Sequence, residues 1–228
     1  MKDKIAITLT VAIFLLVSAG VYINVKQQQA LDRSKIPPKV ELSRGFQRWI
    51  TNLKNKGIII EADNFRLKEE NEIYNSKWTK VYSMDDPQMK MTFEDTIKSL
   101  SGVGKVIFSP SGREFVDYRN QIRGAYQPNE VRFYGQKEDK IIDARILNCD
   151  IKANCYFDRA FFLDNDVFVV TEVSRNVDKK DTNVAACSVD AQCTYTFKVH
   201  VIDLIKNSRL VYESKPFDVV LTKLIPEL

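Results

Sequence analysis

Histidine is the scarcest chemically useful residue in this chain of 228 residues, because His200 is the only one. A single histidine excludes zinc sites built on a His-x-x-x-His pair and limits a Ser-His-Asp triad to this one residue. His200 lies in an alternating, strand-like run, which favours a structural role. The sequence also lacks Gly-x-Ser-x-Gly, so a nucleophile elbow has no support.

Phosphate-loop, redox and nucleic-acid signatures are missing as well. Gly102-Val103-Gly104-Lys105 partly matches a phosphate-binding loop, but Ser99 and Val106 stand where a glycine and a Ser or Thr are required. No Cys-x-x-Cys redox pair is present. The 34 basic and 30 acidic residues interleave, so the net charge of +4 forms no basic stripe. We expect no cofactor and no nucleic-acid partner.

Acidic clusters are few and give no cation site. Asp85-Asp86 and Asp164-Asn165-Asp166 are the best candidates, but neither has the spaced ligands and closing Glu of a calcium loop. Both are typical of turns. We therefore assign no catalytic residue and no metal ligand. Paired carboxylates that meet only in the fold leave no local spacing, so an envelope hydrolase remains an alternative function.

The most informative feature present is an uncharged run of twenty-one residues from Ile5 to Val25. As a helix, about twenty residues span the ~30 Å hydrocarbon core of a bilayer. We expect residues 1–25 to be a membrane anchor that contacts the lipid bilayer. Representative anchor residues are Ile5, Phe14, Leu15, Leu16 and Val25.

The same run also has the features of a signal peptide. Lys2 and Lys4 form a basic start, and Val17-Ser18-Ala19 is a small-residue site for cleavage before Gly20. Cleavage after Ala19 would release a secreted domain. The apolar character continues to Val25, which favours retention as an anchor.

Four cysteines form two Cys-x5-Cys pairs, Cys149 with Cys155 and Cys187 with Cys193. An even number in a repeated local pattern is typical of disulfides made in an oxidising compartment. Four cysteines allow three connectivities, and we favour local closure because each pair frames a short polar loop. Free buried thiols and one four-cysteine zinc site are the alternatives.

The side of the membrane on which the domain lies depends on two opposing observations. Lys26, Arg33, Lys35 and Lys39 outnumber the basic residues before the run, which alone favours a cytoplasmic domain. The cysteine pattern favours export. We give the cysteines more weight and predict a single-pass membrane protein with an extracytoplasmic C-terminal domain.

The segment after the run divides into a stalk and an α+β region. Residues 26–38 are polar and end in a proline pair, which is typical of a stalk. Within 39–104 we predict a helix at about 39–56 with Gly57 as its C-cap, and a short helix at about 93–100 with Thr92 as N-cap. Ile58-Ile59-Ile60 and Asn64–Lys68 have the character of strands.

Residues 105–228 are predicted to be mainly β. Two successions of strand, turn and strand occupy 105–146, and two more occupy 159–213. Val131–Asp143 aligns with Val199–Val211 without a gap. We therefore predict two repeats, each a four-stranded antiparallel unit built from two hairpins.

Phe108-Ser-Pro-Ser-Gly-Arg-Glu-Phe115 resembles the Phe-Ser-Pro-Asp-Gly-Lys signature of WD40-like repeats in TolB-type β-propellers. Val199–Leu204 resembles the third strand of such a blade. The resemblance covers about 105–215 and implies blade-like sheets, which would follow the one or two helices predicted within 39–104. Ser111 replaces the Asp of the signature, and two blades are fewer than the four or so of a closed propeller. A whole propeller would require several chains.

These observations predict a membrane-anchored envelope protein whose exported β-rich domain is a binding or assembly module. Its partner would be a protein or a surface ligand. A pilin-like structural subunit is an alternative, because an apolar N-terminal helix that leads into a disulfide-bearing β domain resembles that architecture. The run lacks the acidic residue and the Gly-Phe processing site that pilins place near its start.

Overall fold

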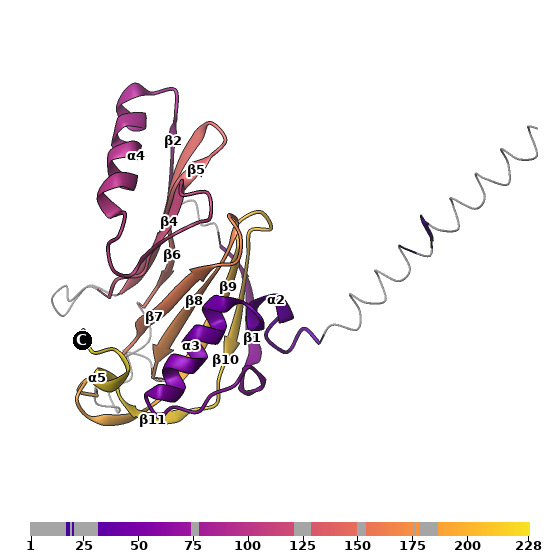
Figure 1. The fold of residues 1–228 in the computed structure, drawn as a ribbon, viewed down its shortest axis with the longest axis vertical. Coiled ribbons are helices and arrows are strands. Elements are labelled where there is room, and N and C mark those ends of the chain that lie inside the picture. The colour runs from indigo at the N-terminus through magenta and orange to yellow at the C-terminus, as the bar shows by residue number, and fades with distance from the viewer. Residues whose placement is uncertain are drawn as a thin grey trace, which may run out of the picture. The chain divides into compact units, whose positions relative to one another are not determined.

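Two antiparallel β-sheets and a few helices make up the part of the chain that the computed structural model describes (Figure 1). The described residues are 17, 18, 20, 32–73, 78–120, 129–149, 154–175, 177 and 187–228. The chain divides into two compact units, 1–34 and 35–228. Apart from residues 17, 18 and 20, the expected anchor lies outside the described residues. Within the described part, no helix is long and apolar enough to cross a membrane.

The first sheet has six strands in the order β1-β10-β9-β8-β7, and β11 pairs with the start of β9. The strands are β1 (Arg66–Glu72), β7 (Tyr156–Phe162), β8 (Val167–Ser174), β9 (Gln192–Asp203), β10 (Ser208–Glu213) and β11 (Phe217–Val220). The second sheet has five strands in the order β2-β6-β5-β4-β3. They are β2 (Thr79–Ser83), β3 (Val106–Phe108), β4 (Glu114–Asp117), β5 (Glu130–Lys137) and β6 (Lys140–Asn148).

Each sheet contains one of the two predicted four-strand successions. β3 to β6 are neighbours in chain order in the second sheet, and β7 to β10 are neighbours in the first. The sheets are larger than the four strands predicted, because β1 and β2 from the preceding segment pair with β10 and β6. Each added strand satisfies the backbone groups of a strand that would otherwise be an edge.

The predicted helix at 39–56 is two helices, α2 (Pro38–Glu41) and α3 (Arg44–Asn55). They are separate because Ser43 is the N-cap of α3, and its hydroxyl accepts a hydrogen bond from the backbone N–H of Phe46 at 3.2 Å. A short helix, α5 (Leu221–Leu224), follows β11.

The second predicted helix starts six residues too late. It is α4 (Pro87–Leu100), and its N-cap is Asp86, whose carboxylate accepts from the N–H groups of Gln88 and Met89. Aspartate followed by proline at the first helical position is a stronger start than Thr92. Thr92 instead lies inside the helix, where its hydroxyl donates to the carbonyl oxygen of Gln88.

The predicted strand Ile58-Ile59-Ile60 is also wrong. These residues pair with no strand, and a 3₁₀ helix, η1 (Ala62–Asn64), follows them. Ile58 and Ile60 are buried and Ile59 is 80% exposed, so their burial alternates as it does in a strand. This alternation of burial arises because Ile58 and Ile60 pack on the core, although the segment forms no ladder of hydrogen bonds with a described strand.

Hydrophobic residues cover both faces of the first sheet. On one face Phe46, Trp49 and Leu53 of α3 pack with a cluster that includes Val169 and Phe197. On the other face the two sheets pack together, and Phe133 stacks on Phe168 with ring centroids 6.2 Å apart.

The outer face of the second sheet contacts α4, where the rings of Phe93 and Tyr134 lie 5.7 Å apart. The layers of residues 35–228 are therefore α3, first sheet, second sheet and α4.

Candidate functional site

Both disulfides expected from local closure are present. Cys149 is bonded to Cys155 and Cys187 to Cys193, with Cα–Cα distances of 5.5 and 6.5 Å. This pairing excludes the free-thiol and zinc alternatives. Cys149 directly follows β6 and Cys155 directly precedes β7, so the first bridge lies where the chain passes from one sheet to the other. Disulfides of this kind form and persist in oxidising compartments.

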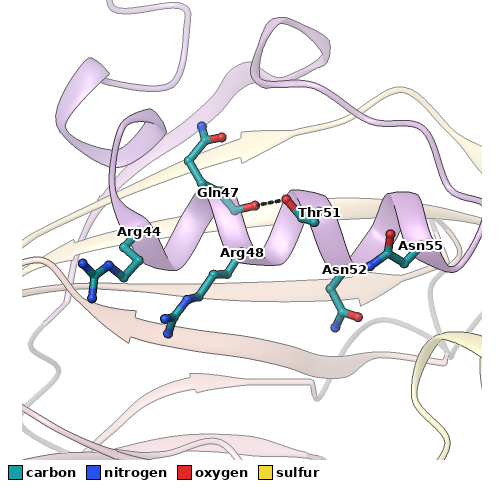
Figure 2. A pocket seen from close by; sticks show the side chains of 6 residues that line it. All are labelled: Arg44, Gln47, Arg48, Thr51, Asn52 and Asn55. Atoms are coloured by element: carbon teal, nitrogen blue, oxygen red, sulfur yellow. Dashed lines mark hydrogen bonds between the residues drawn. The ribbon is translucent and has the colours of Figure 1, made fainter.

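Helix α3 presents a polar face opposite the face that packs on the first sheet. At 100° per residue, the buried side chains Phe46, Trp49 and Leu53 lie on one side of the helix, and Arg44, Arg48 and other polar residues lie on the other. An open groove of about 300 Å³ runs along this side (Figure 2). We call it the outward face of α3, and its lining residues are Arg44, Gln47, Arg48, Thr51, Asn52 and Asn55.

The outward face is rich in hydrogen-bond donors and carries positive charge. α3 contains Arg44, Arg48 and Lys54 but no acidic residue. In Figure 2 the two arginines and Asn52 extend to the same side of the helix. Among the described residues, no carboxylate forms an ion pair with either guanidinium. Two unpaired arginines one helical turn apart are suited to an anionic or polar partner.

The helix that carries this face is fixed to the first sheet by a partly buried hydrogen bond. Trp49 Nε1–H donates to Asp158 Oδ2 at 2.7 Å. Asp158 is the extra residue of a β-bulge in β7, which turns its side chain toward α3. Burial raises the pKa of Asp158, while the Trp49 hydrogen bond and Lys56 act in the opposite direction.

A second cluster, the Glu172 network, lies between the sheets and consists of Glu172, Ser174, Lys198 and His200. The Ser174 hydroxyl donates to Glu172 Oε1 at 2.7 Å, and Lys198 Nζ donates to the same oxygen at 2.8 Å. His200 Nε2 lies 3.0 Å from Glu172 Oε2. Glu172 and His200 are two residues from Val170 and Ile202 of the inter-sheet core, so they point to the same side of their strands.

The charges of this network follow from its contacts. Although burial acts to raise the pKa of Glu172, the hydrogen bond from His200 together with the hydrogen bond and positive charge of Lys198 holds it well below its usual range. Because an ionised carboxylate only accepts, Nε2–H of His200 is the donor. Burial lowers the pKa of His200, so the imidazole is neutral at pH 7. Its Nδ1 is buried and has no hydrogen-bond partner among the described residues.

The acidic clusters singled out from the sequence are structural. Asp164 Oδ1 accepts from the backbone N–H groups of Asp166 and Val167, which confirms a turn. Asp86 is the N-cap of α4. In the part of the chain that the structure describes, no group of three or more His, Cys, Asp and Glu side chains is arranged to hold a metal ion.

Sequence reasoning missed both the outward face of α3 and the Glu172 network. The helical periodicity that predicted the apolar stripe of α3 also determines its polar stripe. The outward face could therefore have been predicted from the sequence. Two of the three partners of Glu172, Lys198 and His200, lie 26 and 28 residues along the chain, and only strand pairing brings them to it. Comparison with protein-family models, curated proteins and solved structures finds no match to the chain.

Proposed function

We propose that this chain is a membrane-anchored envelope protein whose exported β-rich unit is a binding or assembly module. The observation that carries the proposal is the pair of local disulfides in residues 35–228, which fits an oxidising compartment outside the cytoplasm. The uncharged run from Ile5 to Val25 supports attachment to the membrane.

The arrangement of strands supports a scaffold that presents surfaces. Four antiparallel strands that follow one another in space and in sequence are the topology of a propeller blade, and each sheet contains one such succession. We propose that the two successions are blade-like repeats, in line with the resemblance of Phe108–Phe115 to WD40-like signatures. α3 and α4 cover the outer faces of the pair.

The binding surface that we propose for the module is the outward face of α3. It offers two guanidinium groups that form no ion pair with any residue the structure describes, together with amide and hydroxyl donors, and Asp158 and Trp49 hold the helix in place. A rigid helix with exposed donors positions polar contacts better than a loop does.

Alkaline carbonate extraction of membranes from cells that express the full chain tests the anchor. We expect the protein to stay in the membrane pellet. A matched variant, Leu15→Lys/Leu16→Lys, places two charges in the run, each unfavourable by about 3 kcal/mol at the centre of a membrane helix, and is expected in the supernatant. Extraction of the unaltered chain would contradict the proposal.

A further inference from the structure

Positive charge is concentrated in the part of the chain that follows the uncharged run. Residues 26–56 contain eight Lys and Arg but only Asp32 and Glu41 as acids, a net charge of +6. The whole chain has a net charge of +4, so the remainder is slightly acidic. Basic segments beside a membrane span are attracted to anionic lipids.

Only some of these cations are free to meet a partner. Lys35 pairs with Asp63 at 3.0 Å, Lys39 pairs with Asp164 at 2.6 Å, and Lys56 donates to the carbonyl oxygen of Leu224. Arg44 and Arg48 are exposed and have no ion pair among the described residues. Arg44 and Arg48 are thus two of the cations that form no ion pair within the described part of this segment, and both lie on the outward face of α3.

If the uncharged run is the anchor, the segment that links it to residues 35–228 is short. Nine residues, 26–34, separate Val25 from Lys35. Even fully extended, that length of chain reaches about 35 Å. A tether this short holds the unit at a high effective concentration at the lipid surface, so weak contacts suffice for docking.

We propose that the outward face of α3 docks on the anionic phosphate headgroups of the membrane that anchors the chain. The inference rests on the proposed function. Guanidinium groups bind phosphate oxygens with two parallel hydrogen bonds, and Gln47, Asn52 and Asn55 add further donors. The face has no aromatic side chain that could fill a pocket of a protein partner. A lipid headgroup layer fits this chemistry better than a protein partner does.

Protection of Arg44 and Arg48 from an arginine reagent tests the docking. The full chain is placed in lipid nanodiscs of phosphatidylcholine alone or with about one third phosphatidylglycerol, and phenylglyoxal modification is followed by mass spectrometry. Each cation near an anionic surface contributes about 1 kcal/mol, or about a fivefold effect. We expect at least fivefold slower modification of both arginines in the anionic discs and loss of this protection in high salt.

Arg113, an exposed arginine on the turn between β3 and β4, is the internal reference and is expected to react equally in both discs. Equal modification of Arg44 and Arg48 in the two lipids would overturn the proposal. Protection in both lipids would also overturn it, because it would mean that protein covers the face.

Two double variants, each of which removes two positive charges, distinguish the effect of the α3 arginines from the effect of net charge. A fluorophore on Asn55→Cys is expected to be quenched by nitroxide headgroup lipids in the anionic discs. Arg44→Gln/Arg48→Gln should abolish this quenching. Lys80→Gln/Lys140→Gln, which removes two exposed lysines from the second sheet, should leave it unchanged. Equal quenching in both variants would contradict a role for the arginines.

The outcomes distinguish this inference from the proposed function. Extraction of the chain by carbonate would refute the membrane anchor. The arginine protection would then be measured with added phosphatidylglycerol vesicles. An anchored chain whose arginines stay reactive in anionic discs would leave the proposed function intact and refute the docking.

Discussion

At the scale of single residues, the most demanding feature is Glu172, an ionised carboxylate in the interior. Its two oxygens accept from Ser174, Lys198 and His200, and this satisfies a charge that would otherwise be strongly unfavourable. The sequence shows that His200 is the only histidine but not that Glu172 lies beside it. Cross-strand pairing of β8 with β9 creates the contact.

Glu172→Gln is expected to lower the free energy of unfolding by about 3 kcal/mol, because it leaves the partly buried Lys198 without its carboxylate. Urea unfolding followed by circular dichroism measures the change. Glu70→Gln is the control, since Glu70 is exposed on β1, and it should alter the stability by less than about 0.5 kcal/mol. A loss for Glu172→Gln no larger than that of the control would refute the role of the network.

The lowered pKa of His200 should make the free energy of unfolding depend on pH. Burial lowers its pKa in the folded state, so below about pH 6.5 the unfolded chain binds a proton more readily than the folded one. Stability should therefore fall as the pH falls through this region, by up to about 1.4 kcal/mol per pH unit. Lys198 and Arg209 lie near the imidazole and also disfavour its protonation.

Comparison of the parent with His200→Gln at pH 7.5 and 5.0 isolates this contribution, because the chain has no other histidine. The free energy of unfolding should fall less between pH 7.5 and pH 5.0 in the variant than in the parent. Glu172 stays ionised throughout this range because its pKa lies well below its usual value. Burial raises the pKa of Glu114 and Asp158, which opposes the histidine effect equally in both proteins. Identical pH slopes would contradict a buried, neutral His200.

At the scale of elements, α3 lies unusually close to β7. A Cβ atom built on Gly45 would lie 2.3 Å from Cγ of the Phe161 ring, so only glycine allows this approach. The close contact brings Trp49 to Asp158 and leaves the arginines on the opposite side of the helix.

Gly45→Ala is therefore expected to destabilise the protein by about 1–3 kcal/mol through overpacking, although alanine is the better helix former. Thermal unfolding measures the effect. Thr51→Ala on the exposed face of α3 changes a residue of the same helix without this contact and should be close to neutral. A stabilising effect of Gly45→Ala would mean that α3 is not packed on Phe161.

Local patterns predicted the apolar stripe of α3 and most strands of the two sheets. Local patterns gave wrong or incomplete predictions where strand formation or sheet membership depended on residues far away in the sequence. Ile58 and Ile60 alternate in burial like a strand but have no neighbour to pair with. β1 and β2 belong to different sheets although only six residues separate them, and this follows from pairing with β10 and β6. The early start of α4 was readable from Asp86 and Pro87.

At the scale of the whole molecule, residues 35–228 form one compact unit of two packed sheets with a disulfide at the passage between them. The cysteine spacing predicted both bridges, because in the sequence each pair frames a short polar segment between strand-like runs. Within the described part of the chain Arg44 and Arg48 form no ion pair, whereas Lys35 and Lys39 do, and this difference depends on the distant carboxylates Asp63 and Asp164.

The central claim is that the unit lies in an oxidising compartment, outside the cytoplasm. Labelling with a thiol reagent, on intact cells and after denaturation, with and without reductant, tests it most directly. We expect no labelling of Cys149, Cys155, Cys187 and Cys193 after denaturation alone, and full labelling once reductant is added. Labelling of these cysteines in denatured protein that has met no reductant would show free thiols in the cell and contradict the account.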